Sequence, residues 1–86
     1  MNKPQTAVVT ERPVQLQVNL KGAWKTVLQF DAGDTEAAER VQTGVVMLYE
    51  AAPVTSWRIT TTASLPMVLR HLGKNTYGVW VNWGGQ

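Results

Sequence analysis

The sequence contains no cysteine, a single histidine and no long hydrophobic run. Without cysteine there is no disulfide, no thiol nucleophile and no cysteine-zinc site, and a reducing compartment is compatible with this composition. No segment approaches the roughly 18 apolar residues of a membrane span, and residues 7–9 are too short for the apolar part of a signal peptide. We therefore expect a cytoplasmic protein that does not bind membranes.

Groups that could catalyse a reaction are also scarce. His71 has no carboxylate near it in the sequence that could orient it as a general base. Asp31, Asp34 and Glu36 lack the spacing of a calcium loop and are better explained by the start of a helix. There is no phosphate-binding glycine loop, no nucleophile elbow and no metal-spaced histidine pair. We predict a protein that is not an enzyme and that uses no cofactor and no metal.

The length and the charge distribution bound the remaining possibilities. The 86 residues are enough for one small domain with a single core, and four Trp, two Tyr and one Phe supply large apolar side chains for it. Carboxylates gather in residues 31–50, whereas residues 51–86 contain Arg58, Arg70 and Lys74 and no carboxylate. So few scattered cations weigh against nucleic acid as the partner, because affinity for nucleic acid comes from many phosphate contacts.

Residues 34–52 have the pattern of an amphipathic helix, with apolar side chains recurring every three or four positions. Asp34 or Thr35 can cap its first turn, and Pro53 ends it. Gly44 lies in the middle, where glycine costs about 1 kcal/mol relative to alanine; we expect it to mark a close approach of helix to sheet. The expected apolar stripe consists of Ala38, Val41, Val45, Leu48 and Ala52.

The segments around this helix alternate apolar and polar residues, as strands do. We predict strands over residues 14–20 and 24–30, a third over 56–62 and a last one over 76–83. A short helix over residues 64–73 is expected, with Ser64 as its cap, Pro66 in its first turn and Gly73 at its end.

The first two strands form a hairpin, whose loop length decides where Trp24 points. A two-residue turn at Lys21 and Gly22 would pair Leu20 with Ala23 and aim Trp24 outward. A three-residue connection would keep Leu20 and Trp24 on the same face. We favour the longer connection, which adds Trp24 to the core.

These elements predict an α+β domain over residues 13–83, with a flexible arm over 1–12 and a flexible C-terminus over 84–86. The expected architecture has two layers: a four-stranded mixed sheet with one long helix on one face. Strand, strand, long helix, strand, short helix and strand follow one another in the chain.

Four short motifs stand at characteristic points of this order: Leu20-Lys21-Gly22 at the hairpin turn, Asp34-Thr35 at the helix start, Arg58-Ile59 in the third strand and Gly84-Gly85 at the end. Over residues 14–85 the chain resembles the β-grasp fold of ubiquitin and its relatives. Ubiquitin-like modifiers are joined to their targets through a C-terminal Gly-Gly. The resemblance implies that Gly85 would be the conjugated residue once Gln86 is removed.

The sheet face without a helix offers the best candidate surface. We expect amide and hydroxyl side chains there, together with Arg58 and Trp80, and an aromatic or Arg anchor within a polar rim suits a protein partner. Met47, on the polar side of the helix, is a further exposed apolar residue. The alternative is a solvated face with Trp80 turned partly into the core.

We therefore predict a small protein-binding domain, of the accessory type found in phages or bacteria, whose partner the sequence does not identify. A homodimer formed through an uncovered edge strand is one form of such binding. Two alternatives stay open: a modifier conjugated through Gly85, and nucleic-acid binding through the outer sheet face.

Overall fold

The computed structural model describes residues 12–83. The arm expected over residues 1–12 lies, apart from Arg12, outside the described residues, and so does the expected C-terminal segment 84–86 with Gly85.

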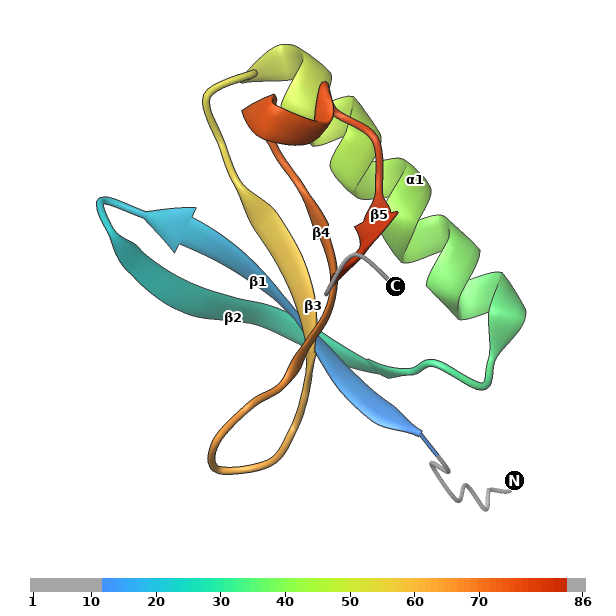
Figure 1. The fold of residues 1–86 in the computed structure, drawn as a ribbon. Coiled ribbons are helices and arrows are strands. Elements are labelled where there is room, and N and C mark those ends of the chain that lie inside the picture. Colours follow the sequence, from blue (N-terminus) through green and yellow to red (C-terminus); the bar gives the residue numbers. More distant parts are fainter. Residues whose placement is uncertain (1–11, 84–86) are drawn as a thin grey trace.

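Five antiparallel strands form one open sheet, and the helix α1 (Thr35–Ala51) packs against one of its faces (Figure 1). The predicted α+β class is confirmed. The predicted strand count of four is wrong, the sheet of the described residues is antiparallel and not mixed, and a β-grasp arrangement is not confirmed. The strands lie in the order β2-β1-β3-β4-β5 and are β1 (Pro13–Leu20), β2 (Ala23–Asp31), β3 (Trp57–Thr61), β4 (Val68–Leu72) and β5 (Val81–Asn82).

The fifth strand comes from the segment that was predicted to be a short helix. β4 pairs antiparallel with β3, so that Trp57 lies opposite Leu72. Leu69 and Leu72 are three residues apart and fit a helical stripe, but the segment between Pro66 and Gly73 is too short for spacing to separate helix from strand. Pairing with β3 decides the outcome.

The last predicted strand is much shorter than expected. The 3-10 helix η1 (Lys74–Thr76) occupies its start, and Tyr77 and Gly78 have φ angles of 57° and 75°. Two successive left-handed residues cannot continue a strand, so regular pairing resumes only at β5, which adds to the free side of β4.

The hairpin between β1 and β2 turns in two residues. Lys21 and Gly22 have φ angles of 55° and 87°, the combination of a type I′ turn, and Leu20 pairs with Ala23. The predicted three-residue connection is therefore wrong. Trp24 lies opposite Asn19 and faces away from α1, on the side that we call the outer face of the sheet.

A β-bulge in β2 returns the apolar residues that follow Trp24 to the helix side of the sheet. The register shifts so that Gln17 pairs with Thr26 but Leu16 pairs with Leu28, which leaves Val27 as an extra residue. Such a bulge changes the face on which the following residues lie. As a result Leu28 and Phe30 lie on the same side of the sheet as α1, although Trp24 does not.

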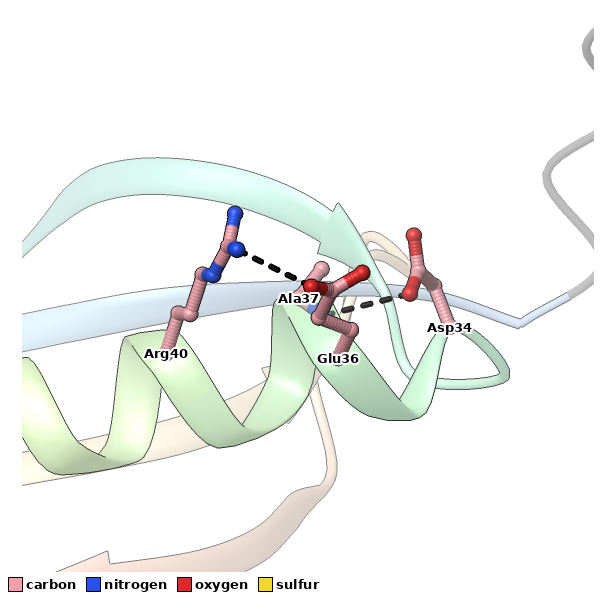
Figure 2. A network of polar contacts seen from close by, with 4 residues as sticks. All are labelled: Asp34, Glu36, Ala37 and Arg40. Carbon is pink, nitrogen blue, oxygen red and sulfur yellow. Dashed lines mark hydrogen bonds and ion pairs between the residues drawn. The ribbon is translucent and has the colours of Figure 1, made fainter.

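The core lies between the sheet and α1. It consists of Val14, Leu16, Val18, Val45, Trp57, Ile59 and Leu72, each less than 10% exposed. The helix begins as predicted, because the Asp34 carboxylate accepts a hydrogen bond from the Ala37 N–H (3.1 Å; Figure 2). The nearby Glu36–Arg40 ion pair is exposed and contributes little to stability (Figure 2).

The buried side of α1 is rotated from the predicted stripe. Val41 and Val45 pack in the core as expected, but Leu48 is 54% exposed and Val46 and Tyr49 pack there instead. Gly44 does not mark a close approach, since a Cβ atom added to it would meet no other heavy atom within 4 Å.

Replacing Gly44 or Gly22 by alanine should change the free energy of unfolding in opposite directions. Gly44→Ala is expected to raise the free energy of unfolding by about 1 kcal/mol, because alanine is the better helix former and has space. Gly22→Ala should lower it by about 1 kcal/mol, because the left-handed φ of 87° strains a Cβ atom. Urea unfolding of both variants measures the difference, and a destabilising Gly44→Ala would contradict the placement of α1.

Candidate functional site

The three residues predicted to bind a partner lie in different places. Met47 is on the exposed side of α1, with 65% of its surface accessible. Arg58, on β3, is partly buried on the outer face, paired across the strands with Gln17 and His71. Trp80 precedes β5 and packs against the core. The structure therefore does not bring Arg58 and Trp80 onto one surface.

Trp80 is a structural residue that links the last segment of the sheet to the helix. Its indole N–H donates a hydrogen bond to the backbone carbonyl of Gln42 on α1 (3.0 Å). The Arg70 guanidinium donates to the Gln42 side chain and, at 3.5 Å, to the Trp80 carbonyl. The prediction that Trp80 stands on the outer face is wrong, and the alternative that Trp80 turns partly into the core agrees with the structure. Val81 pairs with His71 on the outer face, so its neighbour Trp80 points to the helix side.

A different tryptophan accompanies Arg58. The guanidinium carbon of Arg58 lies 4.1 Å from the centroid of the Trp24 ring, the geometry of a cation-π contact. The Arg58 Nε–H donates a 2.7 Å hydrogen bond to the Gln17 Oε1. Burial lowers the pKa of Arg58 from its ordinary value by desolvation, and the side chain stays charged at neutral pH. Arg58 is thus held in one orientation by a ring and an amide.

A row of hydrogen bonds on the outer face holds that amide in place. The Gln17 Nε2 donates to the Thr26 hydroxyl (3.2 Å), and this hydroxyl donates to the Gln15 Oε1 (3.4 Å). The Gln15 Nε2 in turn donates to the Thr60 hydroxyl (3.1 Å). Gln17 is 7% exposed and Thr60 is fully buried, so this face is an ordered polar layer under Trp24 and Arg58.

A cleft of about 320 Å³ opens beside this pair. The rings of His71 and Trp83 meet edge to face, with centroids 5.0 Å apart and planes at 80°. Trp83 is 54% exposed. We call this hollow the outer-face cleft; its walls include Trp24, Arg58, Val68, His71, Asn75 and Trp83.

The outer-face cleft has the groups of a binding site. Its volume is at the lower end of the range for ligand pockets, and apolar walls surround a few polar groups. Arg58 is its strongest hydrogen-bond donor, and none of its lining residues is a carboxylate. Among residues 12–83, no cluster of three or more His, Asp or Glu side chains could hold a metal ion.

Sequence reasoning found Arg58 but missed Trp24 and Trp83 as its companions. Trp24 was placed in the core because the longer hairpin loop was preferred. The dipeptide Lys21-Gly22 carried the available signal, since glycine at the second position suits the two-residue turns with positive φ. Placing Trp80 on the outer face puts Trp83 on the core side by strand alternation, whereas in the structure Trp83 lies against His71 on the outer face.

A second surface is apolar and lies between α1 and the edge strand β2. Val27 and Leu28 are 50% and 42% exposed, and they line a shallow groove with Leu48 and Gly44. The bulge in β2 brings both Val27 and Leu28 to this groove. This groove has few polar groups that could distinguish one partner from another. The outer-face cleft has such a group in Arg58.

Comparisons with known protein families, with curated proteins and with solved structures gave no match for this chain. Among the described residues, no helix has the length and the hydrophobicity needed to cross a lipid bilayer. Any proposal about function therefore rests on the geometry of the surfaces described above.

The different roles of the tryptophans can be tested by hydrogen exchange. The indole N–H groups of Trp80 and Trp57 are hydrogen-bonded to the Gln42 carbonyl and the Thr55 hydroxyl. Both should exchange with deuterium at least about tenfold more slowly than the indole N–H of the exposed Trp83, because exchange requires local opening. Two-dimensional NMR resolves the signals. A Trp80 indole that exchanges as fast as that of Trp83 would contradict its structural role.

Proposed function

We propose that this chain is a non-enzymatic domain that binds another protein through the outer-face cleft. The observation that carries the proposal is the Arg58 guanidinium, stacked on Trp24 and fixed by Gln17 on a sheet face that α1 leaves uncovered. Tryptophan and arginine are the side chains most enriched among the residues that dominate binding energy in protein interfaces. Gln15 and Asn75 add polar groups around them, as in the rim of an interface.

The fixed orientation of Arg58 supports the proposal on energetic grounds. Immobilising a flexible side chain on binding costs about 0.5–1.5 kcal/mol. In the free domain Arg58 is already held by the ring of Trp24 and by Gln17. A partner therefore meets a guanidinium whose ordering cost is reduced before the complex forms.

Nucleic acid is less well supported as the partner. Binding of single strands relies on aromatic faces on which bases stack and on a groove with many cations. The guanidinium of Arg58 covers one face of Trp24, and Trp83 meets His71 edge to face. Arg58 is the one Arg or Lys side chain that lines the outer-face cleft. Conjugation through Gly85 stays a prediction.

The proposal can be tested by capture of a partner from cells that naturally express the protein. The immobilised chain should retain a specific protein, and Trp24→Ser should weaken retention by about 2 kcal/mol, as expected for a central interface residue. Trp24 is partly exposed, so the variant should keep its fold, which circular dichroism verifies. Quantitative mass spectrometry and titration of the captured protein measure the effect.

Met47→Ser provides the matched control, because Met47 is exposed on α1, away from the outer face. Retention that is lost with Met47→Ser and kept with Trp24→Ser would move the binding surface to the helix. Retention that disappears after nuclease treatment would point to nucleic acid instead of a protein.

Self-association through β2 is a second candidate, favoured by the exposed Val27 and Leu28 beside this edge strand. In that case sedimentation equilibrium should show a dimer at micromolar concentration, and Val27→Lys should return it to a monomer by placing a charge in the apolar groove. Thr62→Lys, on the exposed segment after β3, serves as a charge control. A monomer at all concentrations would remove this candidate.

A further inference from the structure

We infer that the group received by the outer-face cleft is the side-chain carboxylate of an Asp or Glu that stands next to a large apolar residue in the partner. The inference deepens the proposed function and rests on it, because it names the chemistry that the same site would recognise.

The first step concerns the donors that Arg58 keeps free. Its guanidinium carbon lies over the Trp24 ring, 4.1 Å from the centroid, and its Nε–H donates a hydrogen bond to the Gln17 Oε1 at 2.7 Å. In the described part of the chain neither Nη atom of Arg58 has a hydrogen-bond acceptor or an ion-pair partner. The edge formed by the two Nη atoms is therefore available, and its parallel N–H groups match the two oxygens of a carboxylate.

The second step concerns the missing negative charge. None of the residues that line the outer-face cleft is a carboxylate. Of the described carboxylates, Asp34 caps α1 and three others lie along it, namely Glu36, Glu39 and Glu50. Asp31 ends β2, where its carboxylate accepts hydrogen bonds from the Arg12 and Gly33 N–H groups. Among residues 12–83, therefore, no carboxylate pairs with Arg58, and the occupant that we infer is a carboxylate of a partner protein. A partly desolvated guanidinium gains more from such a pair than a fully hydrated one does.

The third step concerns the remaining space. A cleft of about 320 Å³ exceeds the volume of one carboxylate, and part of its wall is apolar, formed by Val68, Trp57 and the exposed ring of Trp83. This combination suits an apolar side chain beside the acidic one. The amide of Asn75 at the same cleft can hydrogen-bond the backbone of a bound peptide.

A side-chain carboxylate fits better than the phosphate of a nucleic acid. A single guanidinium supplies one phosphate contact, whereas nucleic-acid affinity is the sum of many such contacts. It also fits better than a chain-terminal carboxylate, since a residue within a chain has neighbours on both sides that can contact the apolar walls and the Asn75 amide of the cleft.

The test is an NMR titration of the isotopically labelled 86-residue chain with two short blocked peptides. One peptide is acetyl-Ala-Leu-Glu-Leu-Ala-amide, and the other replaces its glutamate by glutamine. The Arg58 Nε–H and the indole N–H signals of Trp24 and Trp83 report binding. We expect these signals to shift with the glutamate peptide, and the glutamine peptide to bind about ten- to a hundredfold more weakly, the worth of a charge-assisted pair.

Two variants separate the geometry of Arg58 from its charge. Arg58→Lys keeps the positive charge but loses the fork of N–H groups, so it should bind the glutamate peptide at least about tenfold more weakly than the wild type. Arg40→Lys is the matched control, because Arg40 lies exposed on α1 and pairs with Glu36. Its affinity should equal that of the wild type.

Equal binding of the two peptides, or no shift at millimolar concentration, would overturn the carboxylate inference. The capture experiment with Trp24→Ser would still decide the proposed function independently. Tighter binding of acetyl-Ala-Leu-Leu with a free carboxyl end would assign the carboxylate to a chain terminus and overturn the choice of a side chain. Stronger shifts of the same signals with an eight-residue thymidine oligonucleotide would overturn both the inference and the proposed function.

Discussion

The two-residue turn at Lys21 and Gly22 is the constraint on which the outer face depends. Both residues have positive φ, and the turn fixes the pairing of Leu20 with Ala23. A connection one residue longer would move Trp24 to the helix side, because side chains alternate between the faces of a strand. Arg58 would then have no ring to lie on. The bulge at Val27 completes the arrangement, since it keeps Leu28 and Phe30 on the helix side although Trp24 points outward.

The parts of this fold that the sequence predicted are those with local signals. The cap at Asp34 and the apolar spacing of α1 define that helix within its own residues, and its predicted ends were close to the observed ones. β4 was missed because its five residues form a strand through pairing with β3, which is a long-range effect. The strand predicted over residues 76–83 forms only at Val81–Asn82, because the left-handed Tyr77 and Gly78 interrupt it, and its assignment to the two faces was wrong as well. The proposed binding site combines Trp24, Arg58 and Trp83 from three separate segments, and no local pattern contains that combination.

The outer face shows how a sheet can keep polar side chains ordered without a covering layer. Thr60 and Gln17 are buried there, beneath longer side chains, and they are satisfied by hydrogen bonds within a row that ends at Arg58. A buried polar group without a partner would cost about 1–3 kcal/mol, so each member of the row constrains the next. Because Gln17 is fixed by this row, the hydrogen bond to Gln17 also fixes the orientation of the Arg58 guanidinium. This is the physical difference between Arg58 and the exposed Arg40, whose pairing with Glu36 occurs within one helix.

The charged side chains are distributed unequally between the two faces of the molecule. Glu36, Glu39 and Glu50 belong to α1, whereas Arg58 stands on the opposite face of the sheet. The molecule measures 42 × 28 × 26 Å, so its faces are separated by more than the screening length of about 10 Å at 0.1 M salt. A carboxylate-bearing partner that approaches either face is therefore affected mainly by the charges of that face. For the partner that we propose, carboxylates on the helix would repel it there and the guanidinium would attract it at the outer-face cleft, so that the charge distribution would favour one side of approach.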